Sequence, residues 1–251
     1  MVTVIPAYEP NQMLIQLVQQ LKKLKFSVLL IDDGSSIEKQ SIFDRLQKMA
    51  VVLHHSKNYG KGRALKTAFS CIREQMPGED GIVTVDADGQ HSIADICKMR
   101  KQFHQNPNRL LLGVRKFSGK IPWKSKWGNA ITKVVFALSS GKLRSDTQTG
   151  LRAFPSAWIP FFLKVEGERY EYEMNVLLQS AEHSISWQEV PIQTVYLDQK
   201  NSVSHFQPFR DSIQIYRSIF KFSGSSLLSF LLNYGSVSYT HLRAHETGRN
   251  L

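Results

Sequence analysis

The sequence predicts an α/β fold in which a mostly parallel sheet is flanked by helices. In the first 115 residues, short apolar and β-branched runs alternate with segments whose apolar residues recur at a helical period. The runs are continuously apolar, which is typical of parallel strands that are buried on both faces. Polar loops follow four of the runs. In such sheets ligands bind beyond the carboxyl ends of the strands, so these loops are the expected functional edge.

The expected elements follow from this alternation. Strands are expected at 2–6, 26–31, 50–55, 81–85 and 109–114, with helices between them at 10–25, 37–49, 60–74 and 92–105. The second half is less regular. It suggests a helix at 121–140, a short strand at 149–154, a helix at 168–182, two short strands within 185–197 interrupted at Pro191, and an amphipathic helix at 209–222.

Positive charge is concentrated in one segment. The formal net charge is +11, and the stretch from Arg115 to Arg144 holds eight Lys and Arg residues but no Asp or Glu. Aromatic residues are interleaved with these cations. This composition suits an anionic membrane surface or a nucleic acid, and a solvated basic face explains it equally well.

The C-terminal residues have a different character. Residues 237–247 read VSYTHLRAHET, which resembles a translated sequencing adapter, so we expect residues 237–251 to contribute nothing to the fold. The apolar run at 222–235 then reads as the start of a membrane helix that this tail cuts short. The expected division is a catalytic domain at 1–208, an interfacial helix with a truncated membrane segment at 209–236, and the tail.

The strongest chemical signal is VDADGQH, which follows the fourth strand. Asp86 and Asp88 are so close that their carboxylates repel unless a cation or a proton lies between them. Mg²⁺ or Mn²⁺ binds through few protein carboxylates and completes its shell with water and phosphate oxygens, so the pair predicts a metal–diphosphate site to which Gln90 could add an oxygen. A phosphatase of the haloacid-dehalogenase type and a plain acidic turn are the alternatives. An EF-hand is excluded because Gly89 stands at the fourth position of the loop.

The other three loops suggest a nucleotide. Asp32 and Asp33 in IDDGSS fit an N-cap and turn, or acceptors for a ribose or base edge, and Glu9 fits the second role too. In NYGKG, Gly60 and Gly62 would let the backbone approach a ligand while Lys61 supplies positive charge. The loop matches neither a Walker loop nor G-x-G-x-x-G, so those nucleotide-binding classes are excluded.

These motifs together resemble family 2 glycosyltransferases of the Rossmann-like GT-A fold, in the dolichyl-phosphate-mannose-synthase-like branch that acts on polyprenyl phosphates. The resemblance covers about residues 1–222. It depends on VIPAYEP, IDDGSS, NYGKGRALKTAF, VDADGQH, SDTQTGLRAF, RYEYEMNVL, EVPIQTVY and SHFQPFRDSIQIY, in family order. Processive polysaccharide synthases carry Q-x-x-R-W where this chain has QPFRD, and Asp211 in place of tryptophan weakens a polymerase interpretation.

The resemblance implies a role for each matching residue. Around the nucleotide it implies Pro6, Ala7, Tyr8, Glu9, Asp32, Asp33 and Lys61, and around the metal Asp86, Asp88 and Gln90. Arg115 would contact phosphate and Arg210 would face it, while Asp146, Gln148, Gly150 and Arg152 would border the sugar and the acceptor. Asp88, Arg115 and Asp146 are the expected catalytic residues. Glu171 and Glu173 fit either an orienting role toward basic residues or a solvated helix N-terminus.

The implied reaction is an inverting, Mg²⁺- or Mn²⁺-dependent hexosyl transfer from a UDP- or GDP-sugar to undecaprenyl or dolichyl phosphate. It would occur at the cytoplasmic face of the membrane and serve cell-envelope glycan or glycolipid synthesis. The expected partners are the nucleotide sugar, the polyprenyl phosphate and the membrane surface, with no nucleic acid. Two alternatives stay open: transfer to a saccharide hydroxyl, and a non-catalytic binding module that uses the basic stretch.

Overall fold

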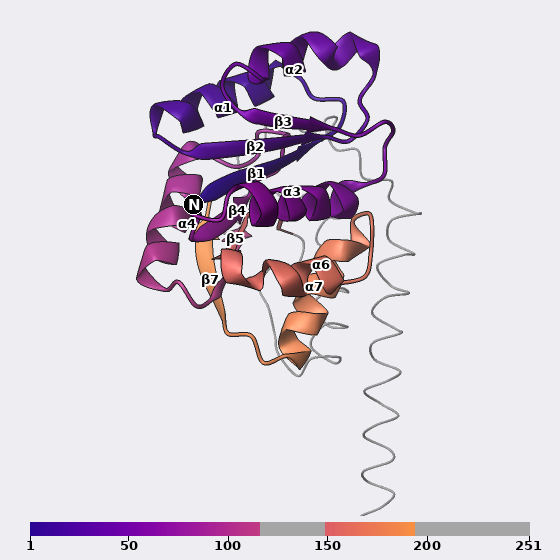
Figure 1. The fold of residues 1–251 in the computed structure, drawn as a ribbon. Helices are drawn as coiled ribbons and strands as arrows, with labels where there is room; N and C mark the ends of the chain where they lie inside the picture. Colours follow the sequence, from indigo (N-terminus) through magenta and orange to yellow (C-terminus); the bar gives the residue numbers. More distant parts are fainter. Residues whose placement is uncertain (116–148, 194–251) are drawn as a thin grey trace, which may run out of the picture.

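The structure, a computed structural model, describes residues 1–115 and 149–193. In these residues helices cover both faces of one sheet (Figure 1). The strands are β1 (Val2–Ala7), β2 (Ser27–Asp32), β3 (Val51–His54), β4 (Gly81–Thr84), β5 (Leu110–Arg115), β6 (Arg152–Pro155) and β7 (Trp187–Ile192). The helices are α1 (Gln12–Lys23), α2 (Gln40–Leu46), α3 (Lys61–Gln75), α4 (Ile93–Gln105), α6 (Ile159–Lys164) and α7 (Glu171–Glu182), with single turns η1 (Ile37–Lys39) and η2 (Ser156–Trp158).

The expected mostly parallel sheet is confirmed. The order of the described strands is β3-β2-β1-β4-β6-β5-β7, in which β1 pairs in parallel with β2 and β4, β2 with β3, and β5 with β7. The exception is β6, which lies antiparallel between β4 and β5. The carboxyl ends of β1, β2 and β4 therefore meet at one edge, and β6 begins there.

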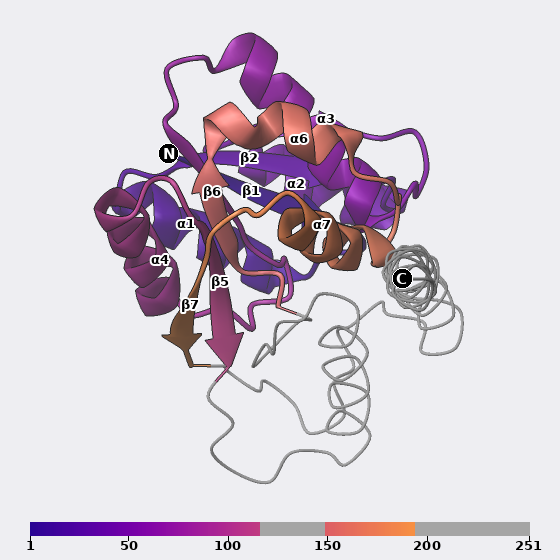
Figure 2. The ribbon, with the colours of Figure 1, turned by 90° about the horizontal axis from the view of Figure 1, so that it is seen from below.

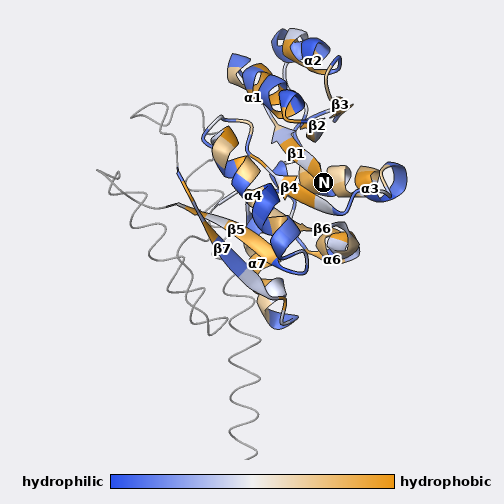
Figure 3. Cartoon of the chain, turned by 90° about the vertical axis from the view of Figure 1, so that its left-hand side faces the viewer, coloured by the Kyte–Doolittle hydropathy of each residue, from blue (hydrophilic) through white to orange (hydrophobic). Residues whose placement is uncertain are grey.

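Two apolar cores lie on opposite faces of the sheet. Side chains alternate between the faces along each strand, so Val2 and Val4 face α3 while Ile5 and Ala7 join the core under α1. Helices α1, α2 and α4 cover one face, and α3, α6 and α7 cover the other (Figure 2). Coloured by hydropathy, these helices carry both hydrophobic and hydrophilic residues, as amphipathic helices packed on a sheet do (Figure 3).

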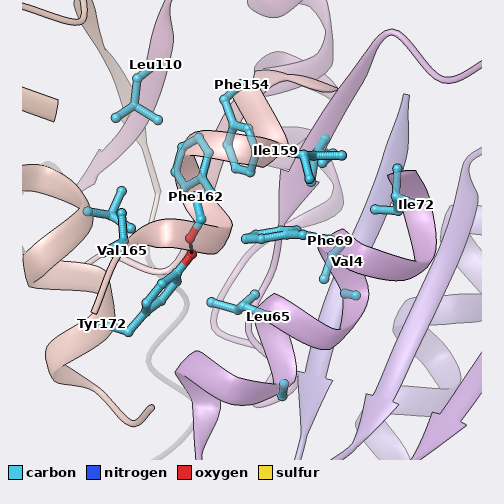
Figure 4. Close-up of a cluster of buried hydrophobic side chains, with 14 of the residues drawn as sticks. Val4, Leu65, Phe69, Ile72, Leu110, Phe154, Ile159, Phe162, Val165 and Tyr172 are labelled. Carbon is cyan, nitrogen blue, oxygen red and sulfur yellow. Dashed lines mark hydrogen bonds between the residues drawn. The ribbon is translucent and has the colours of Figure 1, made fainter. Parts of the chain in front are cut away.

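The core on the α3 side is rich in aromatic rings (Figure 4). The rings of Phe154 and Phe162 stack with centroids 4.0 Å apart, and Phe69 meets both edge-on. The buried Tyr172 hydroxyl donates to the Phe162 carbonyl at 2.8 Å. These contacts hold α6 and α7 against α3. Helix α6 itself was not expected from the sequence, although Pro160 in its first turn is a typical helix-start signal.

Three expected elements differ from the structure. The interruption expected at Pro191 is wrong, because β7 runs through Pro191 as one strand. This is possible because β7 is the last strand of the described sheet, where a missing N–H leaves no partner unsatisfied. Residues 194–197 of the second expected strand lie outside the described residues. The helix expected at 37–49 is shorter, as η1 followed by α2. The helix expected at 168–182 begins only at Glu171, after a turn in which Gly167 has φ of 110°.

Several expectations lie outside the described residues. These are the helices at 121–140 and 209–222, the apolar run at 222–235 and the tail at 237–251. Among the helices of residues 1–115 and 149–193, none has the length and apolar character needed to cross a bilayer.

Candidate active site

The polar loops meet at the carboxyl edge of the sheet, as expected from the strand order. The Asp33 amide donates to the Ala7 carbonyl at 2.8 Å, which ties the loop after β2 to the end of β1. The loop after β1 is tied back by Glu9, whose amide donates to Ser35 Oγ at 2.9 Å and whose carboxylate accepts from Ser36. Tyr8 beside it is 37% exposed at this edge.

Asp32 and Asp33 are both buried, and each is paired with a histidine at the end of β3, where His54 is the last residue of the strand and His55 follows it. Asp32 accepts from the Ser35 amide at 2.9 Å and contacts His54 Nδ1 at 2.9 Å. Asp33 accepts from the Tyr59 amide at 3.0 Å and the Gly60 amide at 2.8 Å, and His55 Nδ1 lies 2.7 Å from its Oδ1. The described contacts of Asp33 therefore fasten the 59–60 loop to β2.

At the centre of the edge, Lys61 joins two acidic side chains. Its Nζ lies 2.6 Å from Asp86 Oδ1 and 2.8 Å from Glu173 Oε2. Lys61 is the first residue of α3, Asp86 follows β4, and Glu173 lies in the first turn of α7. This ion pair brings together parts of the chain that are far apart in sequence, and it gives Glu173 the orienting role that was one of its two interpretations. Glu171 instead accepts from the backbone amides of Glu168 and Arg169.

The two aspartates of the VDADGQH motif differ in their surroundings. Burial opposes ionisation of Asp86, but the charge of Lys61 and the hydrogen bond from His91 outweigh it and hold the pKa of Asp86 well below its usual range. Burial and then the charge of Asp86 raise the pKa of Asp88. Asp88 Oδ1 accepts from the Gln90 amide at 3.0 Å, and Gln90 is half-buried beside it.

Lys61 is held in its charged form. Burial alone would lower the pKa of its ammonium, but the charges of Asp86 and then Glu173 outweigh burial and raise the pKa above its ordinary value. A fixed positive charge beside the acidic pair is suited to an anionic ligand such as a diphosphate.

The donor set fits a divalent cation whose shell is completed by a ligand. In residues 1–115 and 149–193, no group of three or more His, Cys, Asp and Glu side chains is arranged to hold a metal ion. Mg²⁺ commonly takes only one or two carboxylates and completes its shell with water and substrate phosphates, which Asp86 and Asp88 can match. Burial and then the charge of Asp86 raise the pKa of Asp88, and a cation bound to both carboxylates would offset both effects.

Gly150 and Arg152, expected at the acceptor, lie directly behind this centre. A Cβ atom added to Gly150 would stand 2.2 Å from Asp86 Oδ2, so Gly150 makes room for the Asp86 carboxylate. Arg152 is buried, and its guanidinium donates to the Thr149 carbonyl at 3.1 Å and the Glu173 carbonyl at 2.8 Å. These contacts join β6 to α7 and thereby position Glu173.

Gly60 and Gly62 both make room for the 168–172 segment, a packing role that was not expected from NYGKG. A Cβ atom on Gly60 would lie 2.6 Å from the Glu168 carbonyl oxygen, and one on Gly62 would lie 2.6 Å from Tyr172 Cβ. The 168–172 segment therefore packs directly on the start of α3, which is how Glu173 comes within reach of Lys61.

Some expected site residues are not tested. Asp146, Gln148 and Arg210 lie outside the described residues, and for Arg115 the structure places only the backbone, at the end of β5. The sequence reasoning gave no role to His54, His55 or His91. His91 Nε2 lies 3.2 Å from Asp86 Oδ2. For His54 and His55, the available signal was their position as adjacent histidines at the end of the third predicted strand.

The fold is similar to that of solved glycosyltransferases. Glucosyl-3-phosphoglycerate synthase from Mycobacterium tuberculosis, solved with Mn²⁺, uridine diphosphate and phosphoglyceric acid, matches with a TM-score of 0.67 over 89% of this chain and 78% of that chain. The sequence identity is 13%, so this likeness concerns the fold alone. It confirms the expected GT-A-type architecture.

The family follows from the sequence. The model of glycosyl transferase family 2 matches residues 3–164, which is more than half of the chain, so the protein belongs to glycosyl transferase family 2. This assignment replaces the phosphatase alternative, and it confirms the family that the resemblance predicted.

Curated relatives bear out the predicted branch. The chain is 28% identical over 200 residues to an uncharacterised protein of Methanocaldococcus jannaschii, spanning 78% of this chain and 81% of that protein. It is 27% identical over 216 residues to UDP-N-acetylglucosamine–dolichyl-phosphate N-acetylglucosaminyltransferase of Methanococcus voltae, spanning 78% and 85%. It is also 27% identical over 161 residues to undecaprenyl-phosphate 4-deoxy-4-formamido-L-arabinose transferase of Pseudomonas syringae, spanning 60% of this chain and 46% of that protein.

Proposed function

We propose that this glycosyltransferase moves a sugar, with inversion, from a nucleotide diphosphate sugar to a polyprenyl phosphate. The observation that carries the proposal is the Lys61–Asp86–Asp88 centre at the carboxyl edge of the sheet. It combines a fixed ammonium with two carboxylates, which suits a diphosphate and a divalent cation. The names of two relatives, which specify dolichyl and undecaprenyl phosphate, support the acceptor class.

A divalent cation is part of the proposal. Asp86 and Asp88 would hold Mg²⁺ or Mn²⁺, with Gln90 as a further oxygen donor. When bound, the ion would stabilise the negative charge that develops on the leaving diphosphate. Lys61 and Arg115 would contribute positive charge to the same end.

The acceptor reduces the demand for a catalytic base. A phosphate monoester has its second pKa near ~6, so it is already largely dianionic at neutral pH. Its oxygen needs orientation and charge balance more than deprotonation. Asp146 is the proposed base if the reaction uses one, with Gln148 on the acceptor side and Arg210 toward phosphate. Gly150 and Arg152 would act from behind the centre, by positioning Asp86 and Glu173.

The nucleotide would lie along the loops that follow β1 and β2. Pro6, Ala7 and Tyr8 form the end of β1 and its loop, where the exposed Tyr8 ring can meet a base. Glu9 and Asp32 would present oxygens to the ribose or base edge. Asp33 would act there through the loop that it fastens.

The decisive experiment measures nucleotide release from UDP- and GDP-sugars with a polyprenyl phosphate in Mg²⁺ or Mn²⁺. We expect release that requires both metal and acceptor, and we expect Asp88→Ala to abolish it while the far-UV circular dichroism is unchanged. Asp44→Ala, which removes an exposed acid on α2, is the matched control and should keep full activity. Near wild-type activity in Asp88→Ala would contradict the proposed centre, and preference for a soluble saccharide hydroxyl would contradict the acceptor.

We also propose that the active edge works at the cytoplasmic membrane surface. The polyprenyl head group stays at the bilayer surface, and the acid-free stretch from Arg115 to Arg144 suits an anionic surface at about 1 kcal/mol per basic residue near it. Replacing Lys120, Lys124, Lys126 and Lys133 with Gln should release the protein from anionic vesicles in co-sedimentation. Binding that ignores both these charges and salt would point to insertion of apolar segments instead.

A further inference from the structure

Both oxygens of the Asp86 carboxylate already have a nitrogen partner. Lys61 Nζ lies 2.6 Å from Oδ1, and His91 Nε2 lies 3.2 Å from Oδ2. Gly150 closes the rear, because a Cβ atom there would stand within 2.4 Å of either oxygen. With Gly150 behind the carboxylate and His91 beside Oδ2, a cation that binds Oδ1 has to share that oxygen with Lys61.

Lys61 has a second carboxylate within reach. Its Nζ lies 2.8 Å from Glu173 Oε2, and the Lys61 and Glu173 side chains are only 16% and 12% exposed. The backbone of Glu173 is held in place, because the Arg152 guanidinium donates to the Glu173 carbonyl at 2.8 Å. A small shift of the ammonium toward Glu173 would free Asp86 without leaving Lys61 unpaired.

We propose that Lys61 is an internal counter-ion of Asp86 that competes with a divalent cation, and that Glu173 is the positioning residue that keeps the ammonium when the cation binds. This inference rests on the proposed function for placing a cation at Asp86 and Asp88. The Lys61 ammonium and a cation at Asp86 are both positive and would repel each other at this distance. Cation binding is therefore weakened for as long as Lys61 stays on Asp86. A diphosphate offers the ammonium a further anionic partner, so the cation and the nucleotide should promote each other's binding.

The first test measures Mn²⁺ binding alone, by the electron paramagnetic resonance signal of free Mn²⁺. Removing the competing charge in Lys61→Gln should tighten Mn²⁺ binding at least fivefold. Lys66→Gln is the matched control, because Lys66 lies on the same helix and pairs with Glu168, 3.4 Å away. It loses the same charge and should leave the affinity within twofold. Unchanged or weaker binding in Lys61→Gln would overturn the proposal.

The location of the ion is checked in Lys61→Gln, the variant expected to bind Mn²⁺ more tightly. Adding Asp88→Asn to Lys61→Gln should weaken Mn²⁺ binding at least tenfold. If it does not, the ion binds elsewhere and the competition is disproved.

The role of Glu173 is tested by a double-mutant cycle. Glu173→Gln removes a negative charge in any background, but only with Lys61 present does it also remove the place to which the ammonium retreats. It should therefore weaken Mn²⁺ binding at least threefold more with Lys61 than with Gln at that position. Equal losses would mean that Glu173 acts by its charge alone. Glu182→Gln, at the exposed end of α7, is the control, and Glu173→Asp keeps the charge should the Gln variant unfold.

Adding UDP or GDP separates this inference from the proposed function. The nucleotide should strengthen Mn²⁺ binding more in the wild type than in Lys61→Gln, because only the wild type has an ammonium to displace. Equal enhancement would count against the competition. A wild type that binds Mn²⁺ and nucleotide in this way but transfers no sugar would contradict the proposed function and leave the counter-ion role intact.

Discussion

Gly150 stands directly behind Asp86, so close that a Cβ atom added to Gly150 would lie 2.2 Å from Asp86 Oδ2. Its backbone is fixed, because the Thr84 hydroxyl donates to its carbonyl at 2.7 Å. Its φ is not in the left-handed region, so alanine meets an obstacle of space and not of conformation. Antiparallel pairing of β6 with β4 produces this approach, because it brings the residue two before β6 beside the residue two after β4.

Gly150→Ala should therefore impair catalysis far more than folding. The methyl group must push the Asp86 carboxylate forward, and a misplacement of about 1 Å in a reacting centre lowers the rate about 100-fold. We expect that loss in nucleotide release, with a loss of stability of about 1–2 kcal/mol from overpacking. Gly78→Ala is the control, because an added Cβ there meets nothing within 4 Å. Equal activity in the two variants would show that the position of Asp86 does not matter.

Asp33 should behave as a structural residue. Its carboxylate accepts from the backbone amides of Tyr59 and Gly60, and Asp33→Asn would turn an NH₂ group toward at least one of these donors. Leaving a buried donor unpaired costs about 1–3 kcal/mol, so we expect a loss of stability of about 2 kcal/mol in urea unfolding. A residue that only contacts nucleotide would lose affinity for UDP or GDP while the unfolding midpoint stayed the same.

Asp88 should give the metal-free protein a measurable pH dependence. Burial and the charge of Asp86 raise the pKa of Asp88, so the folded protein binds this proton more readily than the unfolded chain. The ionised carboxylate therefore lowers stability above the folded pKa, and the penalty disappears below the unfolded value of about 3.9. Asp88→Asn should raise the melting temperature by about 1–3 °C at neutral pH without metal, and by nothing at pH 3.5.

In the presence of metal, the wild type should have the higher melting temperature and Asp88→Asn the lower one. Saturating Mn²⁺ stabilises only the form that binds it, so the wild type should gain in melting temperature while Asp88→Asn does not. A wild type that is already the more stable protein in chelator at neutral pH would contradict the predicted repulsion between Asp86 and Asp88.

The sequence alone predicts β1 to β5 and the edge of the sheet at which the polar loops lie. The apolar runs that became β1, β2 and β4 are continuous because both faces are buried, and that pattern is local. The direction of β6 cannot be predicted from local sequence, because it depends on the two strands, β4 and β5, between which β6 lies. The pairing of Lys61 with Glu173 could not be predicted from spacing either, since it depends on how the turn at Gly167 lays the 168–172 segment on α3.

That packing gives a prediction whose sign opposes helix propensity. Alanine normally stabilises a helix relative to glycine by about 0.5–1 kcal/mol. Gly62 lies in the first turn of α3, but a Cβ atom there would stand 2.6 Å from Tyr172 Cβ and 2.8 Å from the Glu168 carbonyl carbon. Gly62→Ala should therefore destabilise the protein by about 1–3 kcal/mol, because the 168–172 segment must move away.

The displaced segment carries Glu173, so Gly62→Ala should also affect the active centre. We expect Glu173 to withdraw from Lys61 and the affinity for Mn²⁺ to change with it. Denaturant unfolding and Mn²⁺ titration measure the two effects in one sample series, with Gly78→Ala as the control for a glycine-to-alanine change. A Gly62→Ala protein as stable as the wild type or more so would show that the 168–172 segment does not pack on α3 in solution, and the route by which Glu173 reaches Lys61 would be wrong.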